Sequence, residues 1–142
     1  MRPKTFPIKW GGLKLPRPIK DAYDETQIHT LGVSLEVQVA AENILRGFGV
    51  KNFRNTDCGI LQFRNVFMHT DGFRYTILLP LCGRGVLSAM DGNTVRYLNI
   101  HSKVGVVFNS SKPHDFELLS RSAMMAVSFD FSSARSLKGF YQ

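Results

Sequence analysis

The stretch that decides the fold is FRYTILLPLCGRGVLSAMDGNTVRYLNIHSKVGVVFNSSKPHDFELLSRSAMMAVSFDF, residues 73–131. It contains short apolar runs in close succession, and turn-forming residues separate them. Within residues 73–81 apolar side chains recur at every second position, which indicates a strand with one strongly apolar face. Further strands are predicted at residues 86–90, 95–100, 103–108, 115–119 and 124–131. Strands at this spacing, without intervening helices, predict a mainly β fold, either an antiparallel barrel or a double-sheet jelly roll.

Two Asp-Gly pairs indicate tight turns, because this dipeptide tolerates positive backbone angles. Asp91-Gly92 predicts a hairpin within the stretch. Thr70-Asp71-Gly72 predicts a second hairpin, which would join a strand within residues 59–69 (GILQFRNVFMH) to residues 73–81. Gly83-Arg84-Gly85 superficially suggests a phosphate-binding loop, but it lacks a strand-to-helix transition and is better interpreted as a turn or bulge.

Helices are predicted on both sides of the strands. Residues 33–48 combine a strand-like alternation with a helical stripe, and their length favours a helix capped by Ser34 and ended by Gly47 and Gly49. Residues 132–141 (SSARSLKGFY) predict a short C-terminal helix. Residues 31–142 are therefore expected to form one β-barrel domain with an N-terminal helix and a short C-terminal helix.

Residues 1–30 form a basic, proline-rich arm and linker. The arm up to Lys20 holds six of the 18 basic residues and none of the 11 acidic ones, so it carries most of the net charge of +7. Four prolines in residues 1–20 favour an extended conformation over a helix. Trp10 is expected to dock the arm on the domain. The charge itself is compatible with a solvated terminus or with an arm that lies on phosphates.

The two cysteines and the absence of long apolar runs indicate the cellular location of the protein. Cys58 and Cys82 lie inside apolar runs, where burial is expected to raise the thiol pKa and disfavour catalysis through a thiolate. Two cysteines give no disulfide framework, which favours a reducing, cytoplasmic location. No apolar run reaches the roughly 20 residues that span a bilayer, so no membrane partner is expected.

The four histidines are scattered along the chain at positions 29, 69, 101 and 114. A metal site needs several lone pairs that converge on the ion, and neither a His-x-His pair nor a Cys-x-x-Cys motif is present. A barrel could bring His69, His101 and His114 together, but an exposed or hydrogen-bonded role is the simpler expectation for each. The sequence therefore predicts no metal site, no cofactor, no catalytic residues and no enzyme.

Aromatic and methionine side chains are the better candidates for a site. The alternation predicts that six of them point into the barrel: Phe63, Tyr75, Phe108, Phe116, Met125 and Phe129. They would form either a packed core or the wall of a cavity for one small ligand, oriented by polar groups such as Arg64 and His114. The candidate ligand-binding residues are Phe63, Arg64, Tyr75, Phe108, His114 and Phe116.

Four stretches carry a resemblance to a known family. The order L-x-G-R-G-x-L (residues 81–87), the Asp91-Gly92 turn, KVGVVFNSSKPHDFEL (103–118) and AVSFDF (126–131) resembles the cupin-type N-terminal domain of AraC-type bacterial transcription regulators. Val106, Val107, Phe108 and the Pro113-His114 pair match the family pattern. The family's Pro-Gly-Asp turn is replaced here by residues 101–103 (HSK). The resemblance covers residues 57–141.

What the resemblance implies is a cupin-like sensory or interaction domain. It would bind a small-molecule effector or a regulatory protein, form a homodimer, and control a DNA-binding domain that is absent from this chain. One alternative is a metal-dependent cupin enzyme, an isomerase or oxygenase that uses iron, manganese or zinc. The other is a jelly-roll module that binds nucleic acid or a partner through its basic arm.

Overall fold

The computed structural model describes residues 1–19, 28–54, 56–72 and 74–141. Most of the predicted linker and Phe73 lie outside these ranges. Ten strands and two helices follow one another in the order β1 (Lys4–Pro7), β2 (His29–Leu31), α1 (Leu35–Gly47), β3 (Asp57–Phe63), β4 (Val66–His69), β5 (Tyr75–Cys82), β6 (Arg84–Asp91), β7 (Thr94–His101), β8 (Val104–Asn109), β9 (His114–Leu118), β10 (Met124–Phe131) and the 3-10 helix η1 (Ala134–Tyr141).

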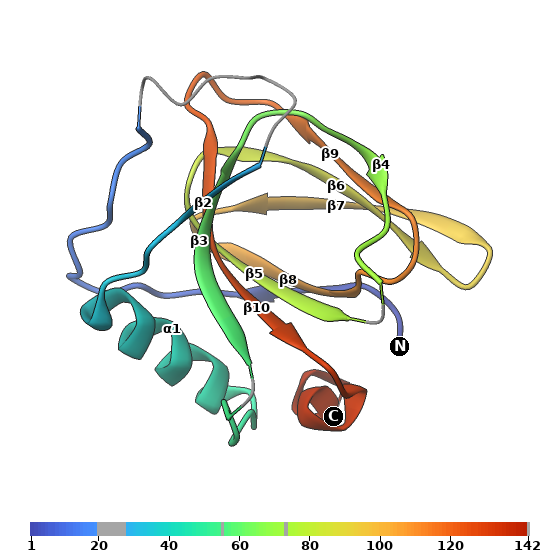
Figure 1. The fold of residues 1–142 in the computed structure, drawn as a ribbon, viewed down its shortest axis with the longest axis horizontal. Coiled ribbons are helices and arrows are strands. Elements are labelled where there is room, and N and C mark those ends of the chain that lie inside the picture. The colour runs from blue at the N-terminus through green and yellow to red at the C-terminus, as the bar shows by residue number, and fades with distance from the viewer. Residues whose placement is uncertain (20–27, 55, 73, 142) are drawn as a thin grey trace.

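The strands form one antiparallel sheet that curls into a half-barrel (Figure 1). Their order is β2-β3-β10-β5-β8-β7-β6-β9-β4, and β1 adds to β8 outside this path. The two halves of the sheet meet where β7 and β8 pair through His101 and Val104 alone. The predicted mainly β, antiparallel fold with an N-terminal helix and a short C-terminal helix is confirmed.

The two predicted hairpins have different outcomes. Strands β6 and β7 form the hairpin at Asp91-Gly92, where Gly92 has a positive φ of 61°. The hairpin predicted at Thr70-Asp71-Gly72 is wrong, because β4 pairs with β9 while β5 lies between β8 and β10. Strand β5 is apolar on both faces and is most stable as a central strand. The chain therefore crosses from one half of the sheet to the other after His69.

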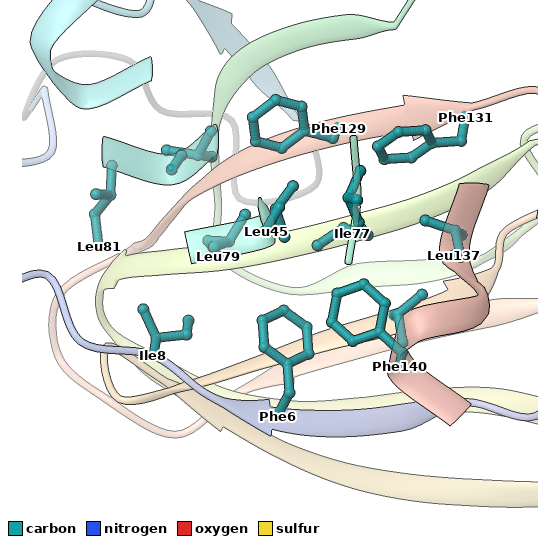
Figure 2. Close-up of a cluster of buried hydrophobic side chains, with 14 of the residues drawn as sticks. Phe6, Ile8, Leu45, Ile77, Leu79, Leu81, Phe129, Phe131, Leu137 and Phe140 are labelled. Atoms are coloured by element: carbon teal, nitrogen blue, oxygen red, sulfur yellow. The ribbon is translucent and has the colours of Figure 1, made fainter. Parts of the chain in front are cut away.

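Strands β5, β8 and β10 separate two apolar clusters. The helix-side core lies between this part of the sheet and β1, α1 and η1, and it includes Leu79 and Phe129 (Figure 2). The barrel core lies on the inner face and includes Leu78 and Phe108. Because both faces of these strands are buried, a period-two pattern identifies the two faces but does not reveal which one lines the barrel.

This ambiguity explains an error in the predicted barrel interior. Phe63, Phe108 and Phe116 belong to the barrel core as expected. The other three side chains that were expected there, Tyr75, Met125 and Phe129, instead belong to the helix-side core or pack against it.

The two helices cover the outer face of the curled sheet (Figure 1). Ser34 caps α1 as predicted, since its hydroxyl accepts a hydrogen bond from the Val37 amide at 3.3 Å. The C-terminal end of α1 meets η1 through stacked rings of Phe48 and Phe140, whose centroids lie 5.0 Å apart. Among the described residues, no helix has the length and apolar character needed to cross a bilayer.

The basic arm is part of the fold. Residues 4–7 form β1 against β8, and the indole Nε1 of Trp10 donates a hydrogen bond to the carbonyl of Pro80 at 2.9 Å. The prediction that Trp10 docks the arm is confirmed. Lys4 is also engaged, because its ammonium donates to the carbonyl of Phe140, whereas Lys9 and Lys14 are exposed.

Candidate metal centre

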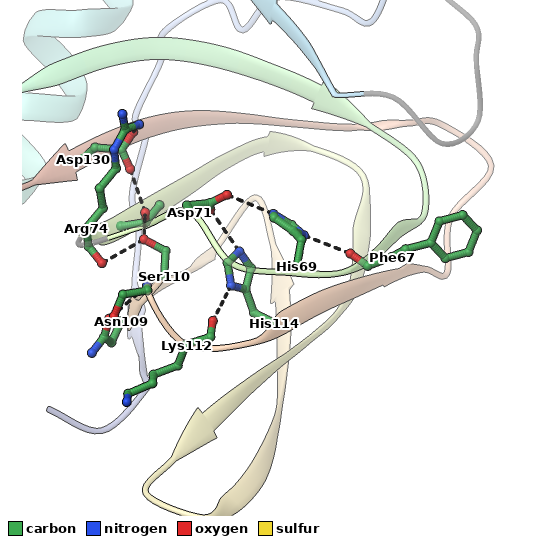
Figure 3. A network of polar contacts seen from close by, with 11 residues as sticks. Phe67, His69, Asp71, Arg74, Asn109, Ser110, Lys112, His114 and Asp130 are labelled. Atoms are coloured by element: carbon green, nitrogen blue, oxygen red, sulfur yellow. Dashed lines mark hydrogen bonds and ion pairs between the residues drawn. The ribbon is translucent and has the colours of Figure 1, made fainter.

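Two histidines that are 45 positions apart in the sequence meet at one end of the half-barrel. His69 is the last residue of β4 and His114 the first residue of β9, and the two are direct partners in the strand register. Their ring centroids lie 4.3 Å apart. Asp71 follows β4 by two residues, and its amide donates to the carbonyl of Ser110 at 2.8 Å, which holds this loop against the turn before β9. The three side chains converge in Figure 3.

The carboxylate of Asp71 faces both imidazoles. Nε2 of His69 lies 3.2 Å from Oδ1 of Asp71, and Nε2 of His114 lies 3.1 Å from Oδ2. The other ring nitrogens contact main-chain carbonyls. Nδ1 of His69 is 2.9 Å from the oxygen of Phe67, and Nδ1 of His114 is 2.9 Å from the oxygen of Lys112.

These contacts constrain where the protons sit. A carbonyl oxygen only accepts hydrogen bonds, so each Nδ1 carries the proton in its contact. A neutral ring then directs the lone pair of Nε2 toward an oxygen of Asp71, and two acceptors that face each other at this distance repel. A positive charge between them removes the repulsion. It can be a second proton on each ring or a metal ion bound by all three side chains.

The ligand set is one that metal ions use. The candidate ligand atoms of His69, Asp71 and His114 all lie within 4.8 Å of one another. Metal-binding histidines usually donate their second ring N–H to a carbonyl or carboxylate, as both rings do here. Two histidines and one carboxylate, with the remaining positions open, are typical of non-haem iron(II) oxygenases. His114 is buried while the Asp71 side chain is 39% exposed, so the cluster is reached from solvent on one side.

An apolar cavity of about 60 Å³ lies behind the cluster. It is lined by four of the six predicted ligand-binding residues, namely Phe63, Phe108, His114 and Phe116. The other two are elsewhere. Tyr75 packs against the helix-side core, and Arg64 lies at the surface with its Nη1 3.4 Å from the carbonyl of Arg121. The structure thus brings together three of the four predicted aromatic residues and one of the two predicted polar residues.

A polar groove of about 310 Å³ opens next to this cavity and shares Asp71 and Thr76 with it. The Thr76 hydroxyl lies 2.7 Å from both the Ser110 hydroxyl and Oδ1 of Asp130. Asp130 also forms an ion pair with Arg74 at 3.6 Å, as seen at the left of Figure 3. This network fixes the start of β5 to the end of β10 and so shapes the approach to the cluster.

The thiols behave as predicted. Burial, with a smaller effect of Glu42, raises the pKa of Cys58 to about 11. Burial also raises the pKa of Cys82. Both thiols are therefore protonated at neutral pH, so neither is a ready nucleophile or metal ligand.

Two residues of the cluster were not among the predicted site residues. His69 was considered as a metal ligand and set aside, and Asp71 was not considered because Asp71-Gly72 was assigned to a hairpin. The available signal was the spacing His69-x-Asp71 at a strand end, followed by a histidine at the start of a later strand. Of the three histidines that a barrel could collect, His101 stays apart. Its Nδ1 accepts a hydrogen bond from the Lys103 amide at 3.3 Å in the turn between β7 and β8.

No family model matches the chain, and no curated protein sequence matches it. Function is therefore inferred from the chemistry of the site.

Proposed function

We propose that this chain is a metal-dependent enzyme domain of the non-haem iron(II) type, with an oxygenase as the reaction class. The observation that carries the proposal is the orientation of three side chains. His69 and His114 direct Nε2 at the two oxygens of Asp71 while both Nδ1 atoms are held by main-chain carbonyls. The sequence analysis expected a non-enzymatic sensory domain and left a metal-dependent enzyme as an alternative. We prefer this alternative.

The three side chains have distinct tasks in this function. His69 and His114 are neutral ligands whose orientation is fixed by the carbonyls of Phe67 and Lys112. Asp71 contributes one negative charge, which leaves a bound divalent ion with net positive charge and open positions. Iron(II) in such a site supplies dioxygen activation. One oxygen atom would be inserted into a C–H bond of the substrate. The second would be reduced to water by two electrons from a reductant and two protons, or would be incorporated into a 2-oxo acid that loses carbon dioxide and becomes a carboxylate shorter by one carbon.

The surroundings support this chemistry. The apolar wall of Phe63, Phe108 and Phe116 keeps bulk water away from the inner side of the cluster. On the open side, the polar groove lets a substrate reach Asp71 from solvent.

The first test is metal binding by the full chain after treatment with a chelator. We expect one equivalent of iron(II), added without oxygen, to bind and raise the thermal midpoint, because a ligand that binds only the folded state stabilises it. His114→Ala and Asp71→Ala should each abolish stoichiometric binding. His101→Ala is the matched control and should bind like the wild type. Equal metal uptake by the wild type and His114→Ala would refute the site.

Activity is tested separately with the iron-loaded protein. Oxygen consumption is measured with ascorbate or 2-oxoglutarate as the electron source, for the wild type and Asp71→Ala. We expect consumption that depends on Asp71. If the protein binds metal stoichiometrically but consumes no oxygen, the metal site is supported and the oxygenase class is refuted.

A second candidate is the sensory domain of an AraC-type regulator. The observation that favours it is the cavity lined by Phe63, Phe108 and Phe116, next to the Pro113-His114 pair of the family resemblance. A thermal-shift screen with small metabolites checks it. A metabolite that stabilises the wild type but not Phe108→Ala, with no metal requirement, would favour this candidate over the enzyme.

The third alternative, in which the basic arm binds nucleic acid, needs a test other than deletion. Removing residues 1–20 would also remove β1 and the hydrogen bond from Trp10. Replacing the exposed Lys9, Lys14 and Arg17 with Gln leaves the strand in place. Salt-dependent binding that falls in this triple variant would support the alternative.

A further inference from the structure

The outer face of strands β7, β6, β9 and β4 carries an exposed groove that the metal chemistry does not use. Its volume is about 400 Å³. Phe67 on β4 and Tyr97 on β7 line it and are 74% and 73% exposed. Exposed aromatic side chains that gather at one hollow mark an interaction surface more often than scattered ones do. Figure 3 shows Phe67 pointing away from the histidine cluster.

The strand register arranges these side chains in a row across the sheet. Tyr97 pairs with Ser88 of β6, and Ser88 pairs with Asp115 of β9. Phe67 lies on β4, the next strand beyond β9. Strands are spaced by about 4.8 Å, so the two aromatic strands stand roughly 14 Å apart with Ser88 and Asp115 between them. A peptide segment fits in a groove of this width.

The charge of the groove is opposite to that of the protein. Asp115 and Glu117 line it, and none of the described Lys, Arg or His residues does, although the chain carries a net charge of +7. Asp115 is half-buried. Within the described part of the chain, neither carboxylate has a side-chain hydrogen bond or an ion pair. Both carboxylates are therefore available to pair with a cation that fills the groove.

We propose that this groove binds a segment of a partner protein that carries Lys or Arg side chains. The cationic groups would lie against the faces of Phe67 and Tyr97 and pair with Asp115 and Glu117. The groove lies next to the cavity at the histidine cluster, and both are lined by Val66, Asp115 and Phe116. The proposed contacts use Phe67, Tyr97, Asp115 and Glu117, none of which is a proposed metal ligand, so peptide binding can be measured without added metal.

The test uses a fluorescein-labelled octapeptide of alternating Lys and Ala, with fluorescence anisotropy as the readout. The net charge of the protein repels this probe, so binding requires a local site. Tyr97→Ala should weaken binding about threefold, and Asp115→Asn combined with Glu117→Gln about tenfold. Glu36→Gln, at an exposed position of α1, is the matched control for the loss of carboxylate charge. Leu35→Ala is the matched control for the loss of an exposed apolar side chain in Tyr97→Ala.

Binding that weakens with salt and with the groove variants, but not with the two controls, supports the proposal. Absence of binding at millimolar peptide, or equal binding of a Glu-Ala octapeptide, overturns it. Analytical ultracentrifugation tests whether a second copy of the chain occupies the groove instead. A dimer that forms with rising protein concentration and is lost in Tyr97→Ala would assign the groove to a second copy of the chain and overturn the partner assignment.

Discussion

Gly139→Ala should destabilise the fold strongly, although it adds only one methyl group. A Cβ at this position would lie 1.7 Å from the carbonyl oxygen of Phe48 and 2.8 Å from its carbonyl carbon. These are main-chain atoms at the end of α1, so they cannot rotate away as a side chain can. Relief requires η1 and α1 to separate by more than an ångström, which loosens the buried Leu137 and Phe140.

The cost follows from overpacking together with partial loss of this apolar contact. Overpacking a well-filled site costs roughly 1–3 kcal/mol. Each fully buried apolar side chain contributes about 1.5–3 kcal/mol. We expect a loss of about 3 kcal/mol in the free energy of unfolding, measured by urea denaturation with circular dichroism. For a chain of this length this corresponds to a decrease of roughly 10 °C in the thermal midpoint.

Gly47→Ala is the matched control, since it is the same substitution at the end of α1. Nothing lies within 4 Å of a Cβ at Gly47, and its φ is not positive. Alanine should therefore stabilise the helix by roughly 0.5 kcal/mol. Unfolding of Gly139→Ala within 0.5 kcal/mol of the wild type would refute the close approach of η1 to α1.

Three further changes test other parts of the structure. Thr76→Val leaves Asp130 and Ser110 without the shared hydroxyl and should cost about 1–2 kcal/mol in a denaturant titration, while Thr94→Val in the exposed start of β7 should cost far less. Trp10→Phe loses the hydrogen bond to Pro80 and should destabilise by about 1 kcal/mol, and an unchanged midpoint would contradict docking through the indole N–H. The pKa of Cys58 is raised to about 11 from an ordinary 9.0, so the thiol contributes stability below pH 9 that is lost as pH rises toward 11. Cys58→Ala should flatten the stability profile between pH 9 and 11, and an equally steep profile in both proteins would refute the shift.

The fold class was predictable because its signals are local. Period-two alternation places most strands within a residue or two, and the Asp91-Gly92 turn forms the hairpin that its residues favour. The partner of β4 was not predictable by the same reasoning. Residues 70–72 have the composition of a hairpin turn, and only the burial of both faces of β5 makes the chain cross to the other half of the sheet.

The candidate site depends on that same nonlocal pairing. His69 and His114 meet because β4 lies beside β9, so an incorrect hairpin hides the metal cluster. Phe63, Phe108 and Phe116 were placed correctly because their strands position them on the barrel side. Tyr75 was misplaced because β5 is apolar on both faces, and alternation alone cannot say which face lines the cavity.

The shared wall formed by β5, β8 and β10 also has a consequence for sequence change. Leu78 faces the barrel core and its neighbour Leu79 the helix-side core, and both are buried. A backbone shift that accommodates a larger side chain on one face moves side chains on the other. Substitutions beneath α1 are therefore expected to alter the cavity behind His114 without touching it, and variants selected for a new ligand should carry compensating changes on the helix side.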